Sequence, residues 1–364
     1  MKLVFFGLSL SSSWGNGHAT TYRSLLRALA DRGHDIVFYE RDVPWYRAHR
    51  DLPDPDFCTL RLYDRLPDIV EIDDEAPDAV IIGSYVEDAE ALVAMLSNRT
   101  SVTLAYYDID TPVTVAGLAA GGAAYLKPRT VPAFDVYLSF SGGPIMTRLK
   151  REFGARMVRS LSCSVDTRIY APIEVPRRYA LGYLGTYDPS RQPALEELLI
   201  EPARRMPDRR FIVAGALYPD DIAWPGNVER IAHLPPSEHA AFYASLVFAL
   251  NVTRADMVKA GYSPSVRIFE AAGCARPVIT DVWPGLAQVL EPGAEVLCAG
   301  SADDVVACLA MADASRERIA RAGYLRVLRD HTATARAVAF EDALIEAAHG
   351  RMARTGSQAR ARAS

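Results

Sequence analysis

Short apolar runs alternate with helical patterns through the first half of the chain. Between the first two runs, residues from about Gly17 to Arg32 place their apolar side chains on one helical face, and Gly33 suits the end of that helix. Runs such as 80–82 are continuously apolar and β-branched, as in strands covered on both faces. The predicted strands are Lys2–Gly7, Asp35–Glu40, Asp78–Gly83, Ser101–Tyr106, Phe134–Phe140 and Arg156–Leu161. Strands that alternate with helices predict βαβ units and a parallel sheet.

The second half repeats this alternation, which predicts a second doubly wound α/β domain. Its predicted strands are Tyr179–Gly185, Arg210–Ala214, Val228–Ala232, Val247–Asn251, Pro277–Asp281 and Glu295–Cys298. Its predicted helices are Pro193–Met206, Ser237–Ser245, Pro264–Gly273, Trp283–Leu290 and Ala302–Ala312, with long helical patterns from about Ser315 to His349.

The two halves are joined by a segment without a helical period that contains Pro172 and Pro176. We therefore expect an N-terminal domain over 1–170 and a C-terminal domain over 179–330. A helix over 331–350 is expected to pack back on the N-terminal domain. The last residues, 351–364, carry four arginines and no acid, which predicts a disordered basic tail, with a membrane-surface or polyanion contact as the alternative.

Composition narrows the class of protein. The 364-residue chain has a formal net charge of −5, which argues against a general nucleic-acid binder. Five scattered cysteines indicate neither a disulfide framework nor a zinc site, and they suit a reducing, cytoplasmic compartment. The apolar N-terminus is better interpreted as a buried strand than as a signal peptide, and no apolar stretch is long enough to predict a membrane span.

The segment 261–281 carries the clearest candidate chemistry. Ser263 is expected to cap a helix with Pro264 as its first residue, which leaves the amides of Ser265 and Val266 without intrahelical partners. Such a helix end attracts anions and suits a diphosphate. Glu270, about a turn and a half along, would accept hydrogen bonds from a ribose diol, or would be a surface carboxylate paired with Arg267. The residues alone favour neither role.

Several motifs in the chain resemble those of GT-B glycosyltransferases. Ser265-x-Arg267-x-Phe-Glu-Ala-Ala, followed by Pro-Val-Ile-Thr-Asp281 and Trp-Pro-Gly-Leu286, is similar to the donor-site helix of that class. The nearest group is the CgeB-like, or spore maturation protein-like, glycosyltransferases. The segments 181–193, Val165-Asp-Thr-Arg-Ile-Tyr-Ala-Pro172 and 107–113 also resemble this group. The resemblance implies a GT-B fold, with two Rossmann-like doubly wound domains facing each other across a cleft.

The resemblance also implies roles for residues of the second half. Glu270 would hold the ribose of a nucleoside-diphosphate sugar, Ser265 and Val266 its diphosphate, and Arg191 would add positive charge there. Further donor contacts are expected from Thr186, Tyr187, Tyr262 and Arg267. The Glu-x7-Glu pattern of many retaining enzymes is broken, because its first acid falls at Tyr262. The sugar and the stereochemical outcome therefore stay open.

In the first half, His18 follows a glycine-bearing loop at the end of the first strand. Gly15, Asn16 and Gly17 are expected near the cleft, but the loop is not GxGxxG, which disfavours an NAD-dependent oxidoreductase. The ordinary pKa of a histidine suits a general base, and by the resemblance His18 would be that base, or it would only hydrogen-bond the loop or the donor.

Asp108 and Asp110 follow the predicted strand Ser101–Tyr106. Either would hold a sugar hydroxyl or orient the base, and Asp110 could equally form a turn. Their Asp-Ile-Asp letters match a metal motif, but they lie in the wrong half for a donor diphosphate, so no metal is expected.

The function predicted from the sequence is therefore metal-independent transfer of a sugar, of the hexosyltransferase type. The expected partners are a nucleotide-sugar donor and a small-molecule, glycan or protein acceptor, with no nucleic acid and no further cofactor; the oligomeric state stays open. The alternatives are a nucleotide-sugar 2-epimerase of the same fold, and a non-catalytic two-domain protein that binds a nucleotide or sugar.

Overall fold

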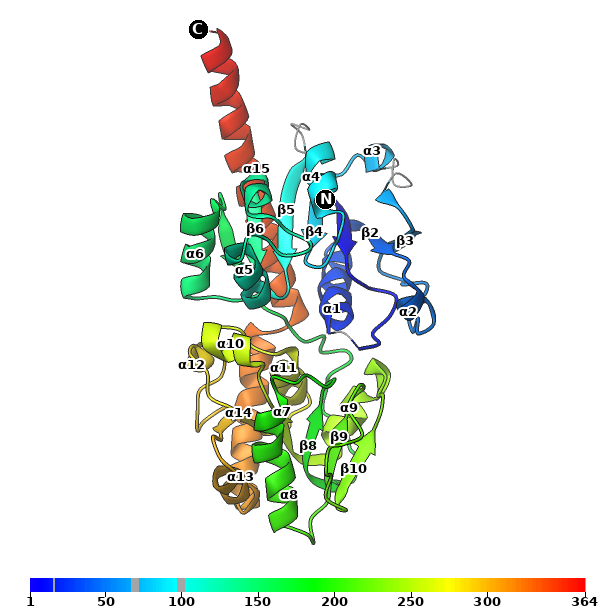
Figure 1. Ribbon diagram of the computed structural model, residues 1–364, viewed down its shortest axis with the longest axis vertical. Coiled ribbons are helices and arrows are strands. Elements are labelled where there is room, and N and C mark those ends of the chain that lie inside the picture. The colour runs from blue at the N-terminus through cyan, green and yellow to red at the C-terminus, as the bar shows by residue number, and fades with distance from the viewer. Residues whose placement is uncertain (16, 67–71, 97–101, 364) are drawn as a thin grey trace. The chain divides into compact units, whose positions relative to one another are not determined.

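The computed structural model describes residues 1–15, 17–66, 72–96 and 102–363 (Figure 1). The chain forms two compact units. Unit 1 comprises Met1–Ser13, His18–Ser162 and Thr334–Ser364, and unit 2 comprises Trp14–Gly17 and Cys163–Ala333. Each unit is built on its own parallel sheet.

Unit 1 contains a seven-stranded parallel sheet in the order β3-β2-β1-β4-β5-β6-β7. The strands are β1 (Lys2–Gly7), β2 (Asp35–Arg41), β3 (Thr59–Tyr63), β4 (Ala79–Gly83), β5 (Thr103–Asp108), β6 (Val136–Ser139) and β7 (Val158–Ser160). The helices between them are α1 (His18–Asp31), α2 (Pro44–Arg47), α3 (Ile72–Glu75), α4 (Ala89–Leu96), α5 (Thr111–Ala119), a 3-10 helix (Pro128–Ala133) and α6 (Pro144–Phe153).

The apolar strands of unit 1 form its core because the sheet is covered on both faces. Val4 and Phe6 pack into one cluster with Val80 and Ile82 of β4, while Phe5, on the other face, stacks on Phe340 with ring centroids 5.7 Å apart. The predicted strands of this half were confirmed to within a few residues; Ser101, at the start of one, lies outside the described residues. The sequence missed β3, a half-exposed edge strand with too few apolar residues to stand out.

Unit 2 contains a six-stranded parallel sheet in the order β10-β9-β8-β11-β12-β13. The strands are β8 (Tyr179–Leu184), β9 (Phe211–Ala214), β10 (Val228–Ile231), β11 (Leu246–Asn251), β12 (Val278–Thr280) and β13 (Leu297–Cys298). The helices are α7 (Gln192–Leu195), which continues through a π-helical turn (Glu196–Ile200) into α8 (Glu201–Arg205), then α9 (Pro236–Ala244), α10 (Ala255–Ala260), α11 (Val266–Gly273), α12 (Leu286–Val289), α13 (Ala302–Leu309) and α14 (Asp313–Asp330).

Both strand orders are those of a doubly wound sheet, which confirms the predicted fold class of two Rossmann-like domains. In such sheets ligands bind beyond the carboxyl ends of the strands, where the strand order reverses. That position lies between β1 and β4 in unit 1, and between β8 and β11 in unit 2.

The C-terminal helix α15 (Ala333–Ala363) packs on unit 1. Glu341 accepts hydrogen bonds from Arg32 Nε and from His34 Nε2, each at 2.6 Å. The predicted tail over 351–364 differs from the structure, in which the helix continues to Ala363. Arg351 and Arg354 both bind Asp135, at 2.7 and 2.5 Å, and alanine and arginine favour helix. Among the described residues, no helix combines the length and apolar character required to cross a bilayer.

Candidate functional site

The first candidate site lies at the carboxyl edge of the unit 2 sheet, around the start of α11. The predicted cap was wrong: the N-cap is Ser265, not Ser263, and Pro264 precedes the helix. Tyr262 has a left-handed backbone (φ +53°) and donates its amide to Pro284 O at 2.6 Å, so the chain turns there and the helix starts two residues later than predicted. Ser263 Oγ instead donates to Gly261 O at 2.9 Å.

The first turn of α11 presents unpaired amides. Ile268 N donates to Ser265 O at 3.2 Å, whereas within the described part of the chain the amides of Ser265, Val266 and Arg267 have no acceptor. With the helix dipole behind them, these amides can bind a negatively charged group.

Arg267 connects this helix to the ends of two strands. Its Nε donates to Leu184 O at the end of β8, and its Nη1 donates to Asn251 Oδ1 at the end of β11, at 3.0 Å. The guanidinium lies 4.4 Å from the centre of the Tyr183 ring. A Cβ on Gly185 would lie 2.5 Å from Nη2, and this nitrogen donates to no acceptor among the described residues. A buried arginine that keeps one N–H₂ group without an acceptor, beside a glycine that leaves room for a ligand, suits a phosphate oxygen.

Glu270 is buried, only 4% exposed, and its Oε2 accepts from the hydroxyl of Tyr243 on α9 at 2.9 Å. Burial, reinforced by the neighbouring carboxylate, holds the pKa of Tyr243 well above its ordinary range, so this hydroxyl stays a donor. The interpretation as a surface carboxylate paired with Arg267 is wrong, since no such pair exists between these two described residues. Tyr243 fixes the orientation of the carboxylate.

The loop after β8 carries the other residues expected to bind the donor. Arg191 folds back so that its Nη2 donates to Thr186 O at 3.0 Å, while its buried Nε has no acceptor in the described structure. Tyr187 donates its amide to Ala216 O at 2.9 Å. A Cβ on Gly215 would lie 2.0 Å from Gly185 O, so the loops after β8 and β9 approach closely and require glycine.

Sequence reasoning missed Asn251, which is fully buried at the end of β11. Its Nδ2 donates to Thr280 Oγ1 at 2.9 Å while its Oδ1 receives Arg267, so it links β11, β12 and α11. Next to it, Thr253 Oγ1 donates to Asp281 Oδ1 at 2.8 Å. The available signal was a polar residue that closes an otherwise apolar strand.

The second candidate site lies in unit 1, at the switch point between β1 and β4. His18 is the first residue of α1, and its Nε2 lies 3.5 Å from Asp110 Oδ2. The hydroxyl of Tyr85 donates to the same oxygen at 3.0 Å, and its ring meets the His18 ring edge-on at 5.3 Å. The structure therefore brings together His18 and Asp110, two of the three residues expected to be catalytic.

His18 Nδ1 is buried without a hydrogen-bond partner among the described residues, an unusual state for a polar atom. Tyr85, which the sequence analysis missed, has a left-handed backbone (φ +66°) that non-glycine residues rarely adopt. Strain of this kind concentrates at functional sites. In the sequence, the one signal for Tyr85 is that it follows shortly after strand β4.

Asp108 does not face solvent, contrary to the expectation that it would lie at the cleft. It is 0% exposed and accepts from Tyr137 OH at 2.5 Å, from Thr114 Oγ1 at 2.8 Å and from Asp110 N at 3.3 Å. Burial raises the pKa of Asp108 to about 6, although these hydrogen bonds oppose the shift. As the last residue of β5 it binds side chains of β6 and α5, and its hydrogen bond from Asp110 N positions the backbone of Asp110.

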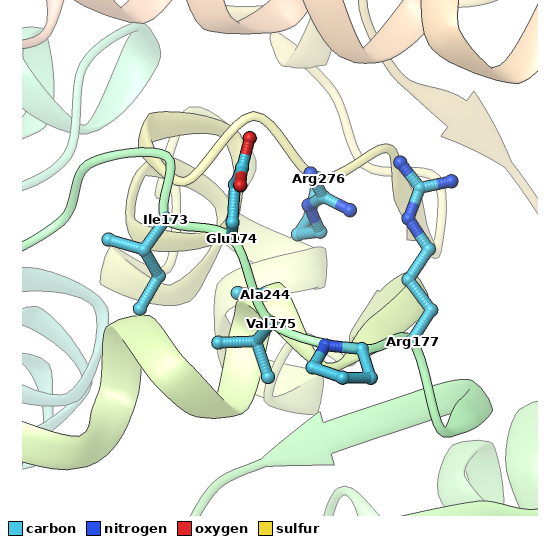
Figure 2. A pocket seen from close by; sticks show the side chains of 7 residues that line it. Ile173, Glu174, Val175, Arg177, Ala244 and Arg276 are labelled. Carbon is cyan, nitrogen blue, oxygen red and sulfur yellow. The ribbon is translucent and has the colours of Figure 1, made fainter.

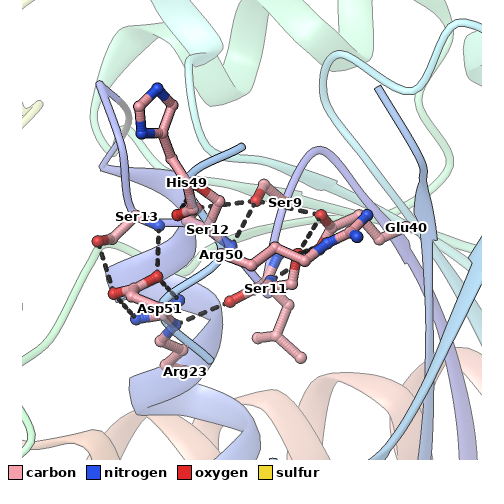
Figure 3. A network of polar contacts seen from close by, with 10 residues as sticks. Ser9, Ser11, Ser12, Ser13, Arg23, Glu40, His49, Arg50 and Asp51 are labelled. Carbon is pink, nitrogen blue, oxygen red and sulfur yellow. Dashed lines mark hydrogen bonds and ion pairs between the residues drawn. The ribbon is translucent and has the colours of Figure 1, made fainter. Parts of the chain in front are cut away.

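Glu40, at the end of β2, fixes the loop that leads from β1 to His18 (Figure 3). The buried carboxylate accepts from Leu10 N at 2.6 Å and from Ser11 N and Oγ at 2.8 and 2.7 Å. Arg23 on α1 and Ser13 both bind Asp51, further along the same loop system. Pairing the loop's donors with one buried carboxylate stabilises it without a regular element.

The three loop residues expected near the cleft are only partly described, because Asn16 lies outside the described residues. Gly15 has a left-handed backbone (φ +68°), and a Cβ on Gly15 or Gly17 would meet nothing within 4 Å. Within the chain, these glycines are therefore not required for close packing.

Comparison with known proteins bears on both units. The model of a family described as glycosyl transferase-like matches residues 191–342. Among solved structures, the fold is similar to that of sucrose-phosphate synthase from Thermosynechococcus elongatus (TM-score 0.70, 15% identity, 98% of this chain and 99% of that chain). It is also similar to HepE from Anabaena in complex with UDP and glucose (0.68, 13%, 95% and 100%) and to BGT of phage T4 in complex with its UDP-glucose substrate (0.62, 10%, 95% and 99%). No protein of curated function matches the sequence. The chain therefore has the GT-B glycosyltransferase-like fold, with a glycosyl transferase-like domain over most of unit 2.

Proposed function

We propose that this protein is a glycosyltransferase that takes its sugar from a UDP-sugar and passes it to a hydroxyl-bearing acceptor. The observation that carries the proposal is the open first turn of α11, where unpaired amides lie beside the undirected Nη2 of Arg267. These N–H groups suit the diphosphate of a UDP-sugar. The choice of UDP rests on similar folds that are described with UDP or UDP-glucose.

In this proposal unit 2 binds the nucleotide. The α11 amides and Arg267 hold the diphosphate, with Arg191 nearby on the loop after β8, and Glu270, held by Tyr243, accepts the ribose hydroxyls. As the bond between the sugar and the diphosphate breaks, negative charge accumulates on the leaving oxygen. Fixed amide dipoles and a guanidinium stabilise that charge without reorganising.

Unit 1 supplies the base. His18 accepts the proton of the acceptor hydroxyl as that oxygen attacks the anomeric carbon, and the leaving diphosphate takes the electron pair of the broken bond. Asp110 orients the imidazole and stabilises its charged form, as a carboxylate does for histidine in other enzymes. Direct displacement with His18 as base would invert the configuration of the sugar.

Within this fold, we assign the chain to the CgeB-like group, on the strength of the motifs in 165–172, 181–193 and 265–286. The assignment predicts that the molecule that accepts the sugar binds in unit 1, and it leaves that molecule unidentified.

The test is a nucleotide panel. A ligand at a hundredfold its Kd stabilises the folded state by about 2.7 kcal/mol, which corresponds to a rise in melting temperature of a few degrees. We expect that rise with UDP, a smaller one with GDP or TDP, and slow release of glucose from UDP-glucose in the absence of an acceptor. A protein whose melting temperature responds to none of these nucleotides would not be a nucleotide-sugar enzyme.

A further inference from the structure

A positively charged cavity lies in unit 2, at the edge of the sheet opposite the start of α11. It has a volume of about 540 Å³, and its lining includes Arg177, Val247 and Pro277, which lie at the amino ends of β8, β11 and β12. Because all these strands are parallel, their amino ends share one edge and their carboxyl ends, near the start of α11, share the other. The cavity is thus separate from the candidate nucleotide site at the start of α11.

The charge of the lining is strongly unbalanced. Five arginines contribute to it against a single carboxylate, Glu317; they are Arg177, Arg276, Arg316, Arg318 and Arg321. Arg316 is buried and pairs with Asp313 at 2.9 Å. In the described part of the chain the side chains of the other four form no ion pair, and their one side-chain hydrogen bond runs from Arg276 Nε to Cys274 O, at 3.3 Å.

Arg276 is placed in the cavity by the end of α11. Ala275 has a left-handed backbone (φ +51°), and Arg276 N donates to Ala271 O at 3.0 Å, so the chain turns sharply and Arg276 joins the lining of the cavity. Burial, together with repulsion from Arg177 and Arg316, lowers the pKa of Arg276 from its ordinary value. An adjoining pocket of about 340 Å³ shares Arg177 and Arg276, and in Figure 2 Arg276 lies between Glu174 and Arg177.

We propose that this arginine-lined cavity is a binding site for a small, multiply charged phosphoryl compound, distinct from the sugar donor. Unpaired guanidinium groups that converge on a half-enclosed cavity repel one another until an anion joins them, and they match phosphate oxygens in bidentate geometry. The volume accommodates a phosphorylated small molecule. The four arginines less the one carboxylate of Glu317 leave three positive charges, which favours an anion that carries several negative charges.

The probe is inorganic pyrophosphate, titrated calorimetrically at low ionic strength, where screening is weakest. Each charge-assisted hydrogen bond lost corresponds to about tenfold in affinity or more. We expect R177Q/R276Q to bind pyrophosphate at least about tenfold more weakly than the unaltered protein. R318Q/R321Q, which changes two exposed arginines of α14, should weaken binding in the same direction.

Two controls separate this cavity from other sites. R209Q removes an exposed arginine of the same unit outside the cavity and should bind pyrophosphate unchanged. V266P removes one amide N–H at the start of α11 and should also retain pyrophosphate binding at the cavity. Without ligand, R177Q/R276Q should melt no lower than the unaltered protein, because it removes like-charge repulsion.

The proposal is overturned if both cavity variants bind pyrophosphate like the unaltered protein, or if the unaltered protein does not bind it. It is also overturned if V266P alone abolishes pyrophosphate binding, since pyrophosphate would then occupy only the site at the start of α11.

Discussion

His18 Nε2 lies 3.5 Å from Asp110 Oδ2, and the same carboxylate oxygen accepts the hydroxyl of Tyr85 at 3.0 Å. His18 begins α1, while Tyr85 and Asp110 follow β4 and β5, and all three lie at the carboxyl edge of the unit 1 sheet, near its switch point. A histidine oriented by a carboxylate is the arrangement that proton transfer requires, and the opposite ring nitrogen, Nδ1, has no partner among the described residues.

Replacing His18 with alanine is expected to lower kcat for sugar transfer by about 10²–10⁴-fold, the usual contribution of a general base. The affinity for UDP should not change, because the nucleotide is proposed to bind unit 2. Steady-state transfer assays and UDP titration measure the two quantities. Asp110→Asn should lower kcat in the same way, and Tyr85→Phe, which keeps the ring against His18, should have a smaller effect. Full turnover by His18→Ala would remove the residue from the reaction.

Val266→Pro tests the amide end of α11. Proline is tolerated at the first position of a helix, and the extended backbone of Ser265 (ψ 145°) suits the residue before a proline, so the helix should persist while one N–H is lost. UDP affinity should fall by about tenfold or more, the effect of losing one hydrogen bond to a charged group. The matched control is Ala255→Pro, at the first position of α10, where the preceding residue is also extended. Equal UDP affinity in both variants would mean that the diphosphate does not lie at α11.

Glu270→Gln is expected to remove discrimination between UDP and an analogue that lacks both ribose hydroxyls. The unaltered protein should bind UDP more tightly because the buried carboxylate accepts hydrogen bonds from the diol. Glutamine keeps the shape and the contact with Tyr243 but loses the charge. Comparing the two ligands on the two proteins isolates the interaction from any general loss of stability. If Glu270→Gln discriminates as strongly as the unaltered protein, the ribose is held elsewhere.

Asp108 predicts a pH dependence of stability. Its folded pKa of about 6 lies above the ordinary value of 3.8, so the folded chain binds the proton more tightly than the unfolded chain. This stabilisation is complete below about pH 4 and is lost as the pH rises to about 6, a change on the order of 3 kcal/mol. Asp108→Asn cannot ionise, so its free energy of unfolding should gain on that of the unaltered protein across this range. Denaturation by urea at several pH values measures the difference, and parallel pH curves for the two proteins would contradict the shift.

Apolar patterning predicted the strands of both sheets because buried parallel strands are nearly continuous apolar runs. It also placed Asp110 after a strand and His18 at the start of the first helix, both at the carboxyl edge of the sheet, where the structure brings the two side chains together. It could not tell which face Asp108 occupies, since the direction of a side chain at the last residue of a strand depends on the neighbouring strands. For the same reason it gave no sign of Glu40, whose partners, Leu10 and Ser11, are about thirty residues away.

The error at the start of α11 has a similar origin. Ser263-Pro264 is a good local cap signal, but the contact between Tyr262 N and Pro284 O fixes a left-handed turn that postpones the helix to Val266. A tertiary contact outweighed the local preference. The arginines of the cavity in unit 2 also come from three separate segments of the chain, so sequence spacing could not reveal them.

Glu341 connects α15 to unit 1 and predicts the opposite pH dependence to Asp108. Hydrogen bonds from Arg32, and then from His34, lower the pKa of Glu341 to about 2, so its stabilisation is complete above the ordinary pKa near 4.5 and is lost as the pH falls toward 2. Glu341→Gln should therefore lower the melting temperature at neutral pH by several degrees, and the difference from the unaltered protein should shrink below about pH 4. The control is Glu346→Gln, which breaks the more exposed pair with Arg159 on the same helix and should cost about 0–1 kcal/mol. If the two variants melt alike at neutral pH, the contact with Arg32 and His34 does not anchor the helix.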